Sequence, residues 1–533
     1  MPMIPSNRST DLTRSTGNLS STENQAPREP TSMRRNHIAW GWNRLLFAPS
    51  LVLALPLVWP GRQPVAGYQE SVSGSPQPAS ASVPPPWGTY RGNPQRTGNT
   101  DQRPGPRQPT VLWIHKSQEH FVAAPVPVGD AVYVSGIGAF NRPSLHLFAL
   151  AGGNPPPLRW SKSAPYLKLP SVSSPAVAED CLLFGDGMHQ DSGGTWHCVD
   201  ARSGLPLWQL PLPGDLIHLE GAPLVVGQRA YMGAGAAGVL AIQWNTAVLE
   251  GKEYDLAAVR QRQQQRWKEL LARYEEDKKK DPDFAIPPDD SQLLKFTPKK
   301  LWQKGQNQWH VDAPLNVSGE LLLVPSAFLD KEKVGERGLL ALRADNGEIV
   351  WKARLEYNPW GGATVAGETI LVPGSSIGYY YKELRAAKGD LTALDRKTGQ
   401  VRWRKEIPTG GIVSCVAVHE GLAIATATDG KVRAFSVADG ERAWLYDCKA
   451  PLFAPPAIAA DTVYVADLTA TVHALDLKTG RPLWTYPLAK DIGNPGMVYG
   501  GITVHAGKLI VATCNLEGPY LGKPTAVVCL GNR

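Results

Sequence analysis

The amino-acid sequence predicts an all-β fold: an eight-bladed β-propeller of four-stranded blades, closed by pairing the N- and C-terminal strands and carrying one helical insertion. Two observations predict it. A short motif ending in tryptophan recurs along the chain, and the composition is rich in turn-forming residues. The 533 residues include 52 glycines, 47 prolines and 17 tryptophans. Such a composition is typical of many short strands joined by turns.

The recurring motif has the pattern of a β-hairpin. VHALDLKTGRPLW at 472–484 is matched by segments ending at Trp403, Trp444, Trp351 and Trp208. In these five copies a small residue precedes the tryptophan by ten positions, which is a repeat signature. Between the two strands, a glycine that tolerates positive φ supplies the turn. The small residues are Ala341, Ala393, Ala434, Ala474 and Cys198, and the glycines are Gly204, Gly347, Gly399, Gly440 and Gly480. A weaker sixth copy places Ala149 eleven residues before Trp160.

The spacing of the tryptophans gives the number of blades. Most gaps between them are 40 to 52 residues, the length of one four-stranded propeller blade. Segment 500–532 supplies three strands without a tryptophan strand, and segment 109–118 supplies a tryptophan strand without the other three. Pairing them closes an eighth blade and leaves no open edge. The blade-ending tryptophans are Trp113, Trp160, Trp208, Trp302, Trp351, Trp403, Trp444 and Trp484.

The A-L-D-x-x-T-G-x-x-x-W pattern resembles the tryptophan-docking repeat of the pyrroloquinoline-quinone (PQQ) dehydrogenase-like superfamily. The resemblance covers residues 87–533 apart from one insertion, and WGTYRGNPQRTG at 87–98 resembles the segment that opens many such propellers. It implies that each tryptophan packs against a neighbouring blade and that the small residue leaves room for this packing. A fold does not fix a function, so cofactor and reaction need separate evidence.

The third blade contains the insertion, which we assign to residues 244–300. Ala241 and Trp302 are 61 residues apart rather than ten. Residues 254–281 predict an amphipathic helix with one apolar face. The face comprises Leu256, Val259, Trp267, Leu270, Leu271 and Tyr274. Two interpretations stay open: a helix docked on the flank of the propeller, and an arm that binds a partner protein.

Three segments precede the propeller. Residues 1–44 predict a disordered basic tail, 45–67 a signal peptide or membrane anchor, and 68–86 a Pro/Ser-rich linker. The apolar run 45–59 is 15 residues long and contains Pro49 and Pro56. It is shorter than the roughly 20 apolar residues that span a bilayer, which favours a signal peptide and leaves attachment through 45–60 open. Export to the periplasm or cell envelope is therefore expected.

The sequence shows no motif for catalysis, cofactor binding or metal binding. No two cysteines are adjacent, as they are in PQQ dehydrogenases of the superfamily, and C-x-x-C-H, G-x-S-x-G and H-E-x-x-H are absent. The histidines show no zinc-type spacing. No cofactor is predicted, and PQQ with Ca²⁺ stays open without motif support. The net charge of +7 includes several N-terminal arginines, so it does not indicate nucleic-acid binding.

The six cysteines allow two interpretations. Cys181 and Cys198 fall on strands whose register would allow a disulfide, and Cys415 and Cys448 are similarly placed. Alternatively the thiols only pack, since Cys198 and Cys529 occupy the small-residue position of the repeat.

The longest connections predict a candidate binding face. Loops between the second and third strands of a blade lie on the same face as the links between blades, and these connections vary most in length. The aromatic and polar residues there suit recognition of a peptide, glycan or protein loop, although loop aromatics also serve packing. The candidates are Asp186, His189, Trp196, Trp360, Tyr379, Tyr380, Tyr381 and Tyr520.

The function expected from these observations is that of a monomeric, non-catalytic, exported propeller that binds an envelope protein or peptide as an assembly scaffold. In architecture it is similar to the BamB-like outer-membrane assembly factors. The alternatives are a PQQ- or metal-dependent oxidoreductase and a glycan-binding propeller.

Overall fold

The structure is a computed structural model that describes residues 88–99, 102–189, 191–378 and 381–532. These residues belong to one compact unit, Ser71–Arg533. The tail at 1–44, the signal peptide or anchor at 45–67 and the linker at 68–86 lie outside the described residues. None of the helices that the structure describes is long and apolar enough to cross a membrane.

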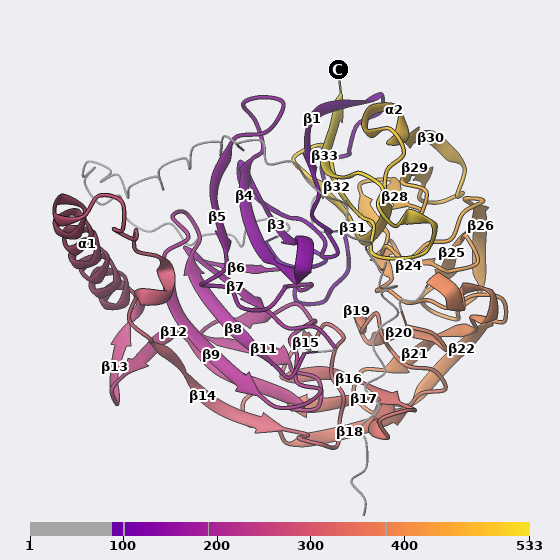
Figure 1. Cartoon of the computed structure of the whole chain (residues 1–533). Coiled ribbons are helices and arrows are strands. Elements are labelled where there is room, and N and C mark those ends of the chain that lie inside the picture. The colour runs from indigo at the N-terminus through magenta and orange to yellow at the C-terminus, as the bar shows by residue number, and fades with distance from the viewer. Residues whose placement is uncertain (1–87, 100–101, 190, 379–380, 533) are drawn as a thin grey trace, which may run out of the picture. The chain divides into compact units, whose positions relative to one another are not determined.

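The described residues form eight antiparallel sheets, and the chain passes through them in order (Figure 1). In the first four blades the strands run from the inner strand outward, each blade completing before the next begins. These are β2 (Val126–Val128), β3 (Ala131–Ile137), β4 (Pro143–Ala149) and β5 (Leu158–Ser163); β6 (Ala176–Ala178), β7 (Cys181–Gly185), β8 (Gly193–Asp200) and β9 (Pro206–Pro213); β10 (Leu224–Val226), β11 (Arg229–Gly233), β12 (Val239–Leu249) and β14 (Thr297–Lys304); and β15 (Asn316–Ser318), β16 (Leu321–Leu329), β17 (Val334–Arg343) and β18 (Ile349–Arg354).

The next three blades follow the same order, and short helices occupy some of the connections. The strands are β19 (Thr364–Ala366), β20 (Thr369–Ser375), β21 (Gly389–Asp395) and β22 (Val401–Ile407); β23 (Ala417–His419), β24 (Leu422–Thr426), β25 (Lys431–Ser436) and β26 (Arg442–Asp447); and β27 (Ala457–Ala459), β28 (Thr462–Ala466), β29 (Thr471–Asp476) and β30 (Pro482–Pro487). The short helices are η1 (Ala139–Asn141), η2 (Asp290–Gln292), η3 (Tyr381–Ala386), α2 (Ala489–Ile492) and η4 (Gly518–Tyr520).

The eighth blade joins the two ends of the described chain, which confirms the predicted closure. Its strands are β31 (Met497–His505), β32 (Lys508–Cys514), β33 (Thr525–Asn532) and β1 (Pro109–Ser117). β1 pairs antiparallel with β33 and places Trp113 opposite Cys529. In Figure 1 the indigo β1 lies beside the yellow β33. Because β33 pairs with β1 on one side and β32 on the other, the C-terminal strand has no exposed edge at the junction.

Seven of the eight blade-ending tryptophans, all but Trp302, hydrogen-bond a backbone carbonyl of the adjoining blade or of the links beside it, in line with the packing that the resemblance implies. The indole N–H of Trp444 donates to the carbonyl of Leu477 at 2.8 Å, and that of Trp403 donates to Val437 at 3.1 Å. Ala474 lies directly opposite Trp484 in the ladder. In blade one, however, Leu147 rather than Ala149 lies opposite Trp160, because the turn from 150 to 157 is longer than in the other copies.

The aspartate of the motif shapes the hairpin turn. Asp476 Oδ1 accepts hydrogen bonds from the backbone N–H of Thr479 at 2.8 Å and from its hydroxyl at 2.6 Å. Gly480 then takes φ +68°, in the left-handed region where a side chain is disfavoured. A Cβ at this glycine would also lie 2.5 Å from Trp444 of the preceding blade. The turn glycine is therefore needed for packing between blades as well as for the turn.

Residues 88–99 join the inner strands of several blades. Carbonyl oxygens of Gly88, Pro94, Gln95, Thr97 and Gly98 accept backbone hydrogen bonds from five inner strands, those of blades two, four, five, six and seven. The guanidinium of buried Arg96 donates to backbone carbonyls of Leu315, Ala222 and Pro223, which lie in the links between blades. The segment that resembles the opening of related propellers thus ties the centre of the ring together.

The insertion consists of β13 (Lys252–Asp255), helix α1 (Leu256–Lys280) and a return segment that leads to β14. The helix agrees with the predicted range 254–281. Asp255 caps it by accepting a hydrogen bond from the N–H of Ala258 at 2.7 Å. Of the predicted apolar face, Leu256, Val259, Trp267 and Leu270 are buried, whereas Leu271 is 37% exposed. Only the first part of the helix is therefore docked.

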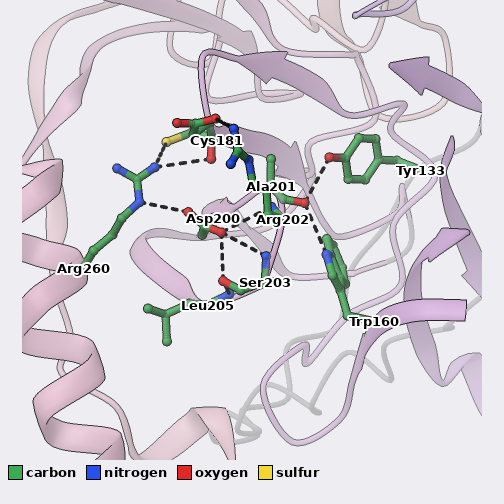
Figure 2. A network of polar contacts seen from close by, with 10 residues as sticks. Tyr133, Trp160, Cys181, Asp200, Ala201, Arg202, Ser203, Leu205 and Arg260 are labelled. Carbon is green, nitrogen blue, oxygen red and sulfur yellow. Dashed lines mark hydrogen bonds and ion pairs between the residues drawn. The ribbon is translucent and has the colours of Figure 1, made fainter. Parts of the chain in front are cut away.

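Helix α1 docks on blade two at the end that carries the hairpin turns. Figure 2 shows the side chain of Arg260 reaching Asp200 and Cys181. Its Nε donates to Asp200 Oδ2 at 2.9 Å, and the guanidinium also donates to the carbonyl of Asp180 at 3.3 Å. In the same view Ala201, next to Asp200, accepts hydrogen bonds from Tyr133 and Trp160 of blade one. The helix thus contacts a turn that already fastens two blades.

Candidate binding face

The loop-rich face is formed by the connections between second and third strands and by the links between blades. The insertion lies on a connection between third and fourth strands, so α1 belongs to the opposite end of the blades. The connection between the second and third strands of blade four is short, because β16 continues to Leu329 and β17 begins at Val334. Tyr379 and Tyr380, in the long connection of blade five, lie outside the described residues.

Two candidate residues are structural, which corrects their assignment to the binding face. Asp186 is 1% exposed; it accepts a hydrogen bond from the N–H of Thr195 at 2.5 Å and its Oδ2 lies 2.8 Å from Nε2 of buried His197. Trp196 is fully buried in strand β8 and packs edge-to-face against Trp208, with ring centroids 6.1 Å apart. Neither side chain is available to a partner.

Tyr381 and Tyr520 pack two long connections against each other. Their rings meet edge-to-face at 5.7 Å, and the backbone N–H of Tyr381 donates to Glu517 Oε1 at 2.7 Å. Tyr520 is 7% exposed. The packing alternative therefore describes these two tyrosines, which hold the loops of blades five and eight together.

Trp360 is the aromatic candidate that remains at the surface. It lies in the link from β18 to β19 and is partly exposed. Gly361, next to it, fits closely against the link that precedes blade six: a Cβ there would lie 2.2 Å from the carbonyl carbon of Ser414. The indole is thus presented on a link whose position is fixed by close backbone packing.

The sixth described candidate, His189, belongs to a cluster with His218, His310 and Asp312. Asp312 Oδ1 lies 2.7 Å from His218 Nε2, and Asp312 Oδ2 lies 2.8 Å from His310 Nε2 and 3.8 Å from His189 Nδ1. One ligand atom from each residue can be chosen such that all four lie within 4.8 Å of one another. Four polar side chains from three segments therefore converge on one point.

Each segment places its histidine by tight backbone packing. His218 lies in the link from β9 to β10, and a Cβ on Gly235 of blade three would come within 3.0 Å of its ring. His310 lies in the link from β14 to β15 and forms a backbone bridge with Ala327. This bridge requires a glycine at position 335, because a Cβ there would lie 1.9 Å from the carbonyl oxygen of Ala327 and 2.9 Å from the Cβ of His310. His189 is held in its loop by Glu220, whose Oε1 accepts from the backbone N–H of His189 at 2.7 Å.

The electrostatics of the cluster centre on Asp312. Burial raises the pKa of Asp312, but His310 and His218 lower it by more and hold it well below its usual range. Burial disfavours a charge on His218, yet Asp312 outweighs burial and raises the pKa of His218 to about 9. Burial lowers the pKa of His189. The carboxylate is thus ionised and attracts positive charge to its site.

Sequence reasoning missed this cluster because it lacks short-range spacing. The three histidines come from the second-to-third connection of blade two and from the two links on either side of blade three. The sequence identifies His189 as a candidate because it lies in a long connection, but it gives no sign that His218 and His310 are its neighbours. The fold places the connections of blades two and three on the same face, and this brings His218 and His310 beside His189.

All six cysteines are buried free thiols, so neither predicted disulfide is present. The ladder between β7 and β8 pairs Cys181 with Asp200 and Cys198 with Leu183, which places the two cysteines diagonally. Burial raises the pKa of Cys198 well above its usual value. The packing interpretation therefore holds for this pair.

The residues present do not fit PQQ as its dehydrogenases hold it. Each of the six cysteines is separated from the others in sequence, so the adjacent Cys-Cys pair expected beneath the quinone does not exist. The cluster that could hold a metal ion consists of three histidines and one aspartate, whereas calcium prefers oxygen ligands.

The eight four-stranded blades, the docked tryptophans and the closing strand define a propeller of the PQQ dehydrogenase-like class. Within it, the chain belongs to the family described as outer membrane protein assembly factor BamB, whose model matches residues 107–268 and 336–515.

Curated relatives match parts of the chain. A BamB of Shewanella oneidensis is 29% identical over 207 residues, covering 35% of this chain and 49% of that protein. The serine/threonine-protein kinase AfsK of Streptomyces griseus is 31% identical over 185 residues, covering 32% of this chain and 21% of the kinase. The matched regions span less than two thirds of each of these relatives.

Solved structures match most of the chain at low identity. The crystal structure of BamB from Moraxella catarrhalis is 14% identical with a TM-score of 0.51, covering 79% of this chain and 97% of that one. The quinohemoprotein alcohol dehydrogenase from Comamonas testosteroni is 13% identical with a TM-score of 0.58, covering 84% and 81%. These likenesses show the fold, which BamB and the alcohol dehydrogenase share.

Proposed function

We propose that this protein is a non-catalytic scaffold of the cell envelope, which binds protein components of outer-membrane assembly through the loop-rich face of its propeller. The observation that carries the proposal is the family match over residues 107–268 and 336–515. It covers seven of the eight tryptophan strands, so the resemblance extends around the ring rather than resting on one blade.

Trp360 is the anchor we assign to the partner. Tryptophan is enriched among residues that dominate binding energy at protein interfaces, because its large ring can be buried against a partner. Among the predicted aromatic candidates, Trp196 and Tyr520 are buried and Tyr381 packs against Tyr520, whereas Trp360 is partly exposed. Export, a position in the envelope and attachment through residues 45–60 belong to the same proposal.

A pull-down tests the proposal. Full-length protein would be immobilised and exposed to detergent-solubilised envelope of the source organism, and captured outer-membrane assembly proteins would be quantified by mass spectrometry. Trp360→Ala should reduce their recovery about ten-fold or more, since truncating a hot-spot residue costs roughly 2 kcal/mol. Lys397→Ala, at a 75% exposed side chain on the opposite end of blade five, is the control and should change nothing. Deleting residues 250–298 asks whether the insertion contributes.

The competing oxidoreductase function has a direct test on the same sample. Purified protein would be incubated with PQQ and Ca²⁺, and dye reduction would be followed with alcohol or aldose substrates. Stoichiometric quinone binding with turnover would contradict the scaffold proposal. Equal recovery of assembly proteins by wild type and Trp360→Ala would contradict the role of the loop-rich face.

A further inference from the structure

We propose that His189, His218, His310 and Asp312 bind one zinc ion, which fastens the loop of blade two to the two links flanking blade three. The proposal is independent of the scaffold function. It rests on the donor set, on the burial of two histidines and on ring nitrogens that have no hydrogen-bond partner.

The donor set matches zinc. Imidazole nitrogens and a carboxylate oxygen are common zinc ligands, and four protein ligands are typical of structural zinc sites. Among divalent first-row metals imidazole also suits copper and nickel, whereas magnesium and calcium prefer oxygen ligands alone. Three nitrogens and one oxygen therefore select a borderline transition metal, and zinc is the redox-inert member of that group.

His310 provides the second observation. It is fully buried, and neither of its ring nitrogens makes a hydrogen bond within the described residues. Nε2 lies 2.8 Å from Asp312 Oδ2, yet the two atoms are not aligned as donor and acceptor. A buried polar atom without a hydrogen-bond partner is costly, and a bound cation would give the ring of His310 and the carboxylate of Asp312 a common partner.

The charges of the cluster are compatible with a bound cation. Three imidazole rings surround one carboxylate, with ring centroids 4.9 to 5.3 Å apart. Protonating all three would place three positive charges around a single negative one in a largely buried site. Without an ion, a protonated His218 alone can balance Asp312, and a divalent ion would take the place of that proton. One divalent ion instead pairs with the carboxylate and accepts the lone pairs of neutral imidazoles.

Binding of an ion would require the side chains to rearrange, because some ligand atoms now lie too close together and others too far apart. Zinc bonds of about 2.0–2.2 Å place tetrahedral ligand atoms roughly 3.3 Å apart. The distances from Asp312 to His218 and His310 are 2.7 and 2.8 Å, so these atoms would move apart around an ion, whereas His189 Nδ1, 3.8 Å away, would move closer. The His189 side chain is 29% exposed, while those of His218 and His310 are fully buried. His189 therefore stands at the entrance and closes on the ion.

The experiment uses the full chain without a histidine tag. After dialysis against a chelator, the protein would be titrated with Zn²⁺ by calorimetry, and with Co²⁺ while visible absorption is recorded, because tetrahedral Co²⁺ absorbs strongly. The expected result is one Zn²⁺ per chain, a tetrahedral Co²⁺ spectrum that Zn²⁺ removes, and a melting temperature that rises with Zn²⁺ and falls again with chelator.

Two variants and a control make the test specific. His189→Ala removes the exposed ligand and should weaken Zn²⁺ binding at least ten-fold while the apoprotein melts as wild type does; His310→Ala should abolish the Co²⁺ spectrum. His419→Ala removes a histidine from the turn between β23 and β24, at the other end of the blades, and should bind Zn²⁺ like wild type. The inference is overturned if no stoichiometric ion binds, or if His189→Ala binds as tightly as the control. Should His310→Ala fail to fold, His189→Ala still decides the outcome.

Discussion

At the scale of single residues, the repeat motif is explained by what each position contacts. The aspartate accepts hydrogen bonds inside the turn, the small residue lies opposite the tryptophan, and the indole N–H donates to the next blade. The glycine has a second role that its turn position does not reveal. In five copies a Cβ on it would collide with the tryptophan of the preceding blade. These positions are Gly204, Gly347, Gly399, Gly440 and Gly480.

This second role predicts a difference between two glycines with similar backbones. Gly480 and Gly421 have φ +68° and +75°, but a Cβ on Gly421 would meet nothing within 4 Å, whereas one on Gly480 would lie 2.5 Å from Trp444. Gly421→Ala should lower the free energy of unfolding by about 1 kcal/mol, the cost of a side chain at positive φ. Gly480→Ala should cost roughly 1–3 kcal/mol more, because the indole must move. Urea denaturation measures both, and equal losses would contradict the packing role.

The sequence predicted those residues that repeat and misplaced those that do not. The tryptophans, the small residues and the turn glycines recur at fixed spacing, so their environment is visible without coordinates. The sequence analysis places Asp186 and Trp196 in a surface loop, because a sequence shows the length of a connection but not where the next strand begins. In the structure β8 begins at Gly193, so Trp196 is a buried strand residue. The partners of His189 lie 29 and 121 residues further along the chain, beyond any local pattern.

At the scale of elements, part of the insertion packs against the propeller and contacts two of its blades. Arg260 joins α1 to the turn of blade two, and Lys162 of blade one pairs with Asp290 in the return segment. The buried amide of Gln263 bonds the backbone of Leu294 in both directions, at 2.9 and 3.0 Å. The last turns of the helix are exposed and charged. The apolar periodicity predicted the helix and its docked face, but not Gln263, because a polar residue gives no signal of burial.

Removing the contact made by Arg260 should loosen the helix without unfolding the ring. The guanidinium hydrogen-bonds a carboxylate that is 15% exposed, and a hydrogen bond to a charged group contributes roughly 1.5–3 kcal/mol. In Arg260→Ala the amides of 256–270 should exchange with deuterium about ten-fold faster or more, while those of β28 and β32 keep their rates. Arg273→Ala, at an 82% exposed side chain further along the helix, should leave exchange unchanged. Unchanged protection in Arg260→Ala would show that apolar packing alone holds the helix.

At the scale of the whole molecule, closure of the ring and residues 88–99 make a rigid support whose two ends differ. One end carries short hairpin turns and the docked helix; the other carries the long connections, Trp360 and the histidine cluster. A zinc ion at that cluster would fix the spacing of three connections on the face we assign to the partner. The fold alone does not distinguish a scaffold from a dehydrogenase, since both classes of protein share it. The two functions must therefore be distinguished by what the loop-rich face binds.

The central claim is that this face binds a protein of outer-membrane assembly, and site-specific photo-crosslinking in living cells tests it most directly. A photoactivatable amino acid would replace Trp360 in one strain and Lys397, on the opposite end of the same blade, in another. The account predicts a crosslinked product from position 360 that contains an outer-membrane assembly protein, and none from position 397. Two results would contradict the account: a crosslink to such a protein from position 397 alone, or no crosslink from either position although the protein is stably present.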